Sequence, residues 1–99
     1  MDARINQPQS INIEIQEKEA EGIYANMAAI GHNNSEFILD FIRIMPGSPK
    51  GKVYARIIMT PQNAKSLDLS LSENIKQYED QYGEIKIDKK ETRIGFQKE

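Results

Sequence analysis

The chain has 99 residues, a length that predicts a single domain with a small core. Its formal net charge of −2 argues against a general attraction to nucleic acid or anionic membranes, and the absence of cysteine excludes disulfides and thiolate sites. No apolar run approaches the roughly 20 residues that cross a bilayer, and the polar start lacks the apolar core of a signal peptide. We therefore expect a soluble, cytoplasmic protein with no membrane partner.

The first part of the chain predicts a flexible lead over residues 1–9, followed by a strand. From residue 10 to residue 16, polar residues alternate with isoleucines. Strict alternation is typical of a β-strand with one face in water, so this segment predicts an edge strand. The isoleucines are Ile11, Ile13 and Ile15. Residues 17–22 then form an acidic connection.

Residues 22–30 are compatible with a strand or with a short helix, because their alanines favour a helix. The strand is preferred because the sequence of residues 31–35, Gly-His-Asn-Asn-Ser, strongly favours a turn. A turn directly before a β-rich segment predicts a hairpin. With a loop of residues 32–35, its register pairs Ile30 with Phe37.

Residues 36–45 predict a central strand that is apolar on both faces and must be covered on both sides. The next residues, 46–52, are rich in glycine and proline and predict a loop. Residues 53–59 predict another strand, and the second hairpin places residue 42 near residue 56.

A long helix is predicted from residue 61 to residue 82. Thr60 is a suitable N-cap, Pro61 is favoured in the first turn, and Gly83 stands where helices commonly stop. Apolar residues recur at helical spacing and form one narrow stripe. The stripe consists of Ala64, Leu67, Leu71, Ile75, Tyr78 and Tyr82. Residues 84–87 predict a short additional strand.

Together these elements predict an α+β domain over residues 10–87. Its sheet is antiparallel and four-stranded, in the chain order β-β-β-β-α, and the long helix packs on one face. The charged residues 88–99 predict a flexible tail.

The two hairpin registers divide the sheet into two faces. Face one carries Phe37 and Phe41 and is assigned to the helix. Face two is then exposed in a single copy, although burial of each isoleucine stabilises a fold by about 1.5–3 kcal/mol. Such a surface predicts a second copy or another partner. The residues of this predicted interface are Ile38, Asp40, Ile42, Ile44, Tyr54, Arg56 and Ile58.

Asp40 and Arg56 are predicted to lie diagonally across the second hairpin on face two. An ordinary cross-strand ion pair is one interpretation. The other is a pair that fixes the register of an interface.

The sequence offers no catalytic constellation. His32 is the single histidine, and a solvent-exposed residue of the hairpin turn is its simplest interpretation. No spacing of carboxylates around it supports a metal site, and no phosphate-binding loop is present. We therefore predict a non-enzymatic protein without a cofactor.

The charges are uneven around the second hairpin: it carries four cationic residues, and no acidic residue occurs between residues 41 and 67. They either contact a phosphate backbone or form a solvated loop. They are Arg43, Lys50, Lys52 and Arg56.

A set of residues spread over positions 11–86 carries a family resemblance. It comprises Tyr24-x-Asn26, Glu36-Phe37-x-Leu39-Asp40-Phe41, Arg56-Ile57-x-Met59-x-Pro61, Ala64-Lys65, Leu71, Asn74-Ile75-x-x-Tyr78-Glu79 and Gly83-x-Ile85. With these residues the chain resembles a widespread bacterial family of small proteins that has no established activity.

Four strands followed by a long helix are also similar to the SecB export-chaperone family, whose tetramers hold unfolded clients in apolar grooves. This likeness covers element order and apolar surface only, because the chain is shorter and lacks a clear second helix. We therefore predict a homo-oligomeric binding protein, a homodimer or homotetramer, of the SecB-like chaperone or adaptor kind. Its partners would be other proteins or unfolded chains. The alternative is a nucleic-acid-associated accessory protein that uses the basic hairpin of residues 43–56.

Overall fold

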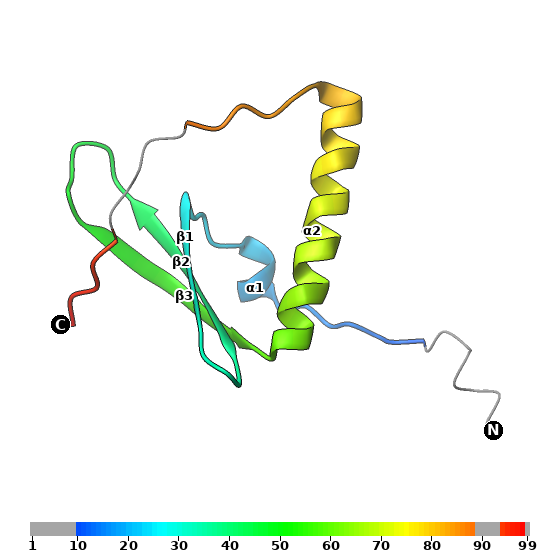
Figure 1. Cartoon of the computed structure of the whole chain (residues 1–99), viewed down its shortest axis with the longest axis horizontal. Helices are drawn as coiled ribbons and strands as arrows, with labels where there is room; N and C mark the ends of the chain where they lie inside the picture. Colours follow the sequence, from blue (N-terminus) through cyan, green and yellow to red (C-terminus); the bar gives the residue numbers. More distant parts are fainter. Residues whose placement is uncertain (1–9, 89–93, 99) are drawn as a thin grey trace.

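The computed structural model describes residues 10–88 and 94–98 (Figure 1). The predicted lead, residues 1–9, and part of the predicted tail, residues 89–93 and 99, lie outside the described residues. The elements in chain order are α1 (Glu17–Glu21), β1 (Met27–His32), β2 (Phe37–Ile44), β3 (Gly51–Met59) and α2 (Pro61–Tyr82). The strands form one antiparallel sheet in the order β1-β2-β3. The α+β class is therefore confirmed, with a sheet of three strands.

The predicted first strand is not paired within this chain. Residues 10–16 belong to no helix or strand, and Figure 1 shows this segment extending away from the sheet on the side of α2. Ile13, in the middle of the segment, is 88 % exposed. Alternating polarity makes a segment suitable for a ladder, but a strand exists only where a second strand supplies hydrogen-bond partners. The short strand predicted over residues 84–87 is also absent from the described elements.

The first hairpin has the predicted strands in a register shifted by two residues. Ile30 pairs with Leu39, and His32 pairs with Phe37. The cause is Asn33, whose side-chain Oδ1 accepts hydrogen bonds from the backbone N–H groups of Ser35 (2.8 Å) and Glu36 (3.0 Å). The loop therefore spans residues 33–36. A shift of two keeps every side chain on its predicted face.

The second hairpin is also shifted, and it contains a β-bulge. Asp40 pairs with Arg56 and Phe41 with Ala55, but the next pair is Ile42 with Val53. Tyr54 is thus the extra residue of β3. Such a residue interrupts the alternation of side chains between the two faces of the strand.

The bulge corrects the predicted face of Tyr54. Its ring lies 4.3 Å from the Arg43 guanidinium carbon and 5.2 Å from Lys52 Nζ. Arg43 and Lys52 are paired with each other and both belong to face one by register. The placement of Tyr54 on face two was therefore wrong, because a regular ladder was assumed through residue 54.

Helix α2 has the predicted bounds. Thr60 Oγ1 accepts a hydrogen bond from the N–H of Asn63 (3.2 Å), and Pro61 occupies the first turn. At the other end, Gly83 adopts a positive φ of 101° and its N–H donates to the carbonyl of Glu79 (2.9 Å). A glycine tolerates this conformation, which ends the helix.

The helix does not lie flat on the sheet. It begins directly after β3 and leans away from it, so none of its residues is buried (Figure 1). The buried core of the single chain consists of Leu39, Asp40 and Ile42, which are 7 %, 3 % and 5 % exposed. All three belong to the central strand β2, which has a neighbouring strand on each side.

Candidate functional site

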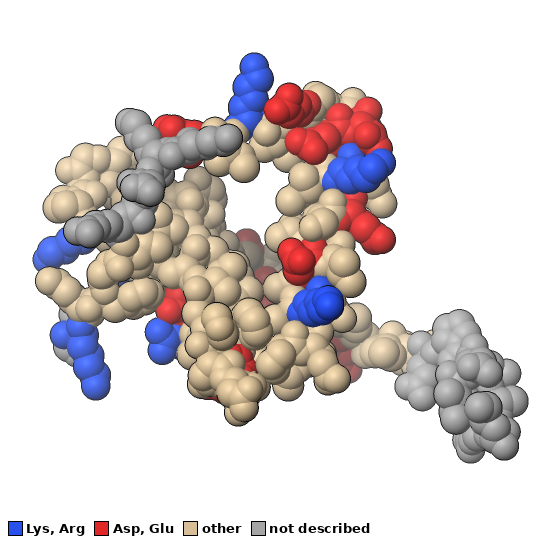
Figure 2. All heavy atoms as spheres, in the orientation of Figure 1, with Lys and Arg blue, Asp and Glu red and all other residues tan. Residues whose placement is uncertain are grey.

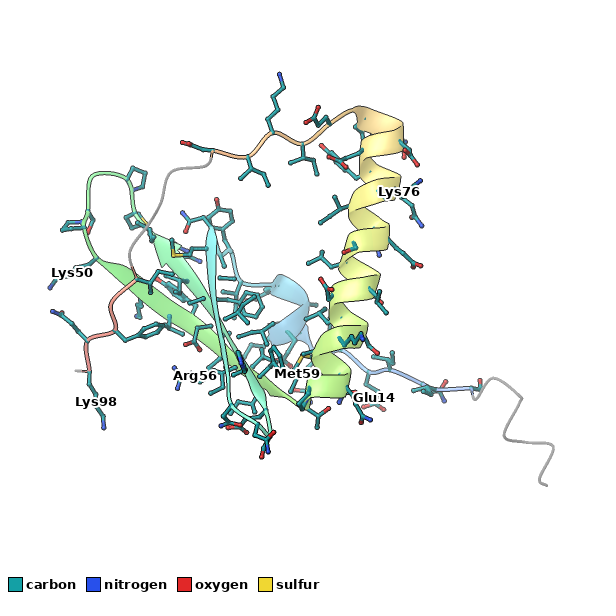
Figure 3. All side chains as sticks on the ribbon, viewed as in Figure 1. Glu14, Lys50, Arg56, Met59, Lys76 and Lys98 are labelled. Atoms are coloured by element: carbon teal, nitrogen blue, oxygen red, sulfur yellow. The ribbon has the colours of Figure 1, made fainter. Side chains whose placement is uncertain are left out.

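An opening separates α2 from face one of the sheet. Figure 2 shows it as a gap between filled side-chain surfaces, and the segment after α2, residues 83–88, runs back above it toward the sheet. In Figure 3, Met59 of face one lies between the sheet and the first turns of α2. This places α2 on the side of face one. We call the opening the wedge, and its walls are α2 and face one.

The helix wall of the wedge is the apolar stripe. Lys76 points away from the sheet in Figure 3, and the stripe lies on the opposite side of the helix because successive residues turn by about 100°. Leu71, Ile75 and Tyr78 of this stripe are each 41–56 % exposed. The rings of Tyr78 and Tyr82 are in contact, with centroids 4.9 Å apart. An apolar surface therefore faces the wedge along most of the helix.

The sheet wall carries a cluster of aromatic and cationic side chains. Arg43 lies over the rings of Tyr24 (5.8 Å) and Tyr54 (4.3 Å), distances typical of cation–π contacts. Its Nε and Nη2 also donate to the backbone carbonyl of Tyr24, at 3.2 and 3.1 Å. Arg43 is therefore held by three contacts at the end of the sheet that is farther from the start of α2.

Asn26 fixes the chain on which Tyr24 lies. Its Nδ2 donates to the carbonyl of Ile44 and its Oδ1 accepts from the N–H of the same residue, both at 2.9 Å. Its own N–H donates to the carbonyl of Ile42 (3.0 Å). The side-chain amide thus replaces a backbone peptide and extends the ladder beyond β1. This hydrogen-bonded extension gives a structural reason for Asn26 in the spacing Tyr24-x-Asn26.

Face two carries the ion pair. Asp40 and Arg56 are directly opposite each other, not diagonal as predicted. Arg56 Nε and Nη2 donate to the two carboxylate oxygens at 2.7 and 2.8 Å. The hydrogen bonds from Arg56 are the main cause that lowers the pKa of Asp40; burial opposes them, and the charge of Arg56 adds to them. The pKa of Arg56 is raised by the same hydrogen bonds and by the charge of Asp40.

The residues predicted as the partner interface differ in their surroundings. Asp40 and Ile42 are buried within the single chain, and Ile38 and Ile44 are half-buried. Ile58 and Arg56 are exposed, and Tyr54 belongs to face one. Part of face two is covered by the chain itself, since Phe96 borders a hollow with Ile38, Asp40 and Arg56. Open apolar surface therefore remains in the wedge and, on face two, at Ile58.

The four cations do not form one patch. Arg56 binds Asp40 on face two, whereas Arg43 is bound to Tyr24 on face one. Lys50 and Lys52 lie at the end of the sheet where β2 connects to β3. The bulge and the central ladder thus separate residues that are close in sequence.

No catalytic or metal-binding geometry emerges from the described ranges. His32 stacks on Phe37, with ring centroids 5.2 Å apart. In the described part of the chain, no group of three His, Cys, Asp or Glu side chains is arranged to hold a metal ion. Nor does any helix within residues 10–88 combine the length and the apolar character that crossing a bilayer requires.

Comparison with known proteins gives a family but no activity. A family model described as "Protein of unknown function (DUF3467)" matches residues 1–87. No curated protein and no solved structure matches the chain. The predicted resemblance to a family of unknown function is thereby confirmed.

Proposed function

Because the chain belongs to the DUF3467 family, whose description assigns no function, we propose from its surface that it acts by binding and not by catalysis. In this proposal the protein is a homo-oligomer, a homodimer or homotetramer. It offers apolar surface to other proteins in the manner of a SecB-like chaperone or an adaptor.

The observation that carries the proposal is the amount of surface left uncovered. Apolar side chains among the described residues are open to solvent: Leu71, Ile75 and Tyr82 of α2 are 56, 41 and 66 % exposed, and Ile57 and Ile58 of β3 are 44 and 58 % exposed. Contiguous apolar patches of more than a few hundred Å² mark interaction surfaces.

A second copy is the simplest cover for the stripe. The stripe is narrow and runs along a helix of 22 residues, so two such helices can pack side by side. A two-fold axis would bring identical patches together, which is the common arrangement in homo-oligomers. The sheet wall of the wedge then remains as an apolar and aromatic groove for an extended segment of a client.

The nucleic-acid alternative has less support from the geometry. Of the four cations, Arg56 is neutralised by Asp40 and Arg43 is engaged with a carbonyl and two rings. Only Lys50 and Lys52 of this set remain for phosphate contacts, and the formal net charge is −2. Electrostatic binding of a nucleic acid needs several such contacts.

Two measurements test the proposal. Light scattering after size-exclusion chromatography should give a mass of two or four copies at micromolar concentration. The purified protein should then suppress the aggregation of a chemically unfolded client at stoichiometric amounts. A mass of one copy contradicts the homo-oligomer. A multimer without effect on the client contradicts the chaperone part, and salt-sensitive retardation of a nucleic acid in a gel would favour the alternative.

A further inference from the structure

We propose that residues 10–16 of one copy add as a strand to the free outer edge of β3 in a second copy. The inference rests on the self-association proposed above and adds a second contact to the packing of the two helices. It makes the fourth strand of the sheet an intermolecular one.

The donor segment has the composition of a strand but no partner in its own chain. Ile11, Ile13 and Ile15 alternate with polar residues, and all three are exposed. Within the described residues, the only backbone hydrogen bond of the segment is at its end, where the Gln16 carbonyl accepts from Ala20 (2.9 Å). Figure 1 shows the segment directed away from its own sheet. It is therefore placed to reach another molecule.

The acceptor edge is the outer side of β3. This strand has nine residues without a proline, and β2 is its only neighbour among the described elements. Val53, Ile57 and Ile58 on it are exposed. A long edge with unpaired backbone groups and apolar side chains is a template for strand addition unless something covers it.

The outer edge of β1 also has no neighbouring strand among the described elements, and charge favours β3 as the acceptor. Glu14 lies within the donor segment, and residues 17–21 after it contain three acids and one lysine, namely Glu17, Glu19, Glu21 and Lys18. Strand β3 and the residue before it carry Lys50 and Lys52 besides Arg56, which is paired with Asp40, whereas β1 contains neither an acid, an arginine nor a lysine. An acidic donor therefore complements the edge of β3, and opposite charges on neighbouring strands are mutually favourable.

The alternation also fixes which side each residue takes. The side chains of a strand point to opposite faces in turn, so all three isoleucines share one face. On face one they continue the apolar row of Ala55, Ile57 and Met59 and enter the wedge beside α2. Glu14 then points to face two, away from the wedge.

Because the sequence contains no cysteine, engineered disulfides can test this pairing directly. The full chain with Ile13→Cys is co-expressed with a differently tagged chain that carries cysteine at Ala55, Ile57 or Met59. These three acceptors cover the possible registers on face one. The matched control carries Ile30→Cys. It also replaces an isoleucine of face one, but in the edge strand β1.

Mild oxidation should yield a covalent dimer of the two tagged chains with at least one β3 acceptor, several-fold more than with Ile30→Cys. Equal or preferential capture by Ile30→Cys overturns the choice of edge. A further variant carries Ile13→Cys and the acceptor cysteine in the same chain. If its disulfide forms within one chain and not between two chains, the pairing between copies is wrong. If no acceptor is captured and light scattering still gives a multimer, the strand exchange is wrong while the proposed oligomer stands. A mass of one copy defeats both.

Discussion

Asp40 on β2 and Arg56 on β3 face each other across the ladder, and two hydrogen bonds of 2.7 and 2.8 Å join the guanidinium to both carboxylate oxygens. The carboxylate is buried, whereas 55 % of the Arg56 side chain is exposed. The pair thus neutralises a charge in the core while its other end stays hydrated. A bidentate pair of this geometry is stronger than a single neutral hydrogen bond.

The first prediction concerns pH. The pKa of Asp40 in the folded state is lowered, so it lies below the unfolded value of about 3.9. Its contribution to stability is therefore complete above about pH 4 and is lost as the pH falls through the folded-state pKa. Asp40→Asn should be less stable than the wild type at pH 7, and the difference should shrink below pH 4. Urea midpoints at fixed protein concentration measure it, and a constant difference down to pH 3 contradicts the pairing.

The second prediction separates this pair from an exposed one. Arg56→Met leaves the buried carboxylate without its partner and should lower the melting temperature at pH 7. The control is Lys76→Met, which breaks the 3.2 Å pair with Asp80 on the outer side of α2. Both partners of that pair are exposed, so the melting temperature should hardly change. Equal effects of the two substitutions would show that the position of the Asp40 pair in the core is irrelevant.

The sequence predicts those parts of the fold that local chemistry decides. Helix α2 has both predicted ends because Thr60, Pro61 and Gly83 act through their own backbone groups. Both hairpin registers differ by two residues from the predicted ones. In the first hairpin the cause is the side chain of Asn33, which decides where the loop closes. Tyr54 changes face through a bulge that depends on the partner strand. Residues 10–16 have the pattern of a strand, but a pattern does not reveal whether its partner is in the same chain.

The third prediction concerns Asn26, which replaces a peptide group opposite Ile44. Asn26→Ala removes two hydrogen bonds and should lower the free energy of unfolding by about 1–3 kcal/mol. Asn26→Asp keeps the acceptor but turns a carboxylate oxygen toward the Ile44 carbonyl, so its loss should be larger at pH 7 than at pH 3. The control is Asn74→Ala, which removes one exposed hydrogen bond to Ser70 and introduces a better helix former. That variant should keep wild-type stability in urea unfolding, and an equal loss would refute the special role of Asn26.

The fourth prediction compares two strand glycines. A Cβ at Gly51 would stand 3.0 Å from Ile42 Cγ2 and 3.1 Å from Ile44 Cγ1. Ile42 is buried and has little room to move, so Gly51→Ala should cost about 1 kcal/mol of unfolding free energy. Gly31→Ala meets nothing within 4 Å and should be neutral or slightly stabilising. If urea unfolding gives both variants the same stability, the close approach over Gly51 does not restrain Ile42.

The fifth prediction uses two leucines that are two residues apart on α2. Leu71 belongs to the apolar stripe and is 56 % exposed, whereas Leu69 is 60 % exposed and lies on the opposite side of the helix. Nearly equal exposure in the single chain means that Leu71→Asp and Leu69→Asp should cost the isolated fold about the same.

The two variants should differ only where a second copy covers the stripe. Each copy of a two-fold dimer contributes one Leu71, so Leu71→Asp removes about 4–6 kcal/mol and raises the dissociation constant roughly 10³- to 10⁴-fold, whereas Leu69→Asp leaves it unchanged. Light scattering over a dilution series measures both constants. If both variants dissociate alike, the contact between copies is not made by the stripe, and if neither does, α2 lies outside it.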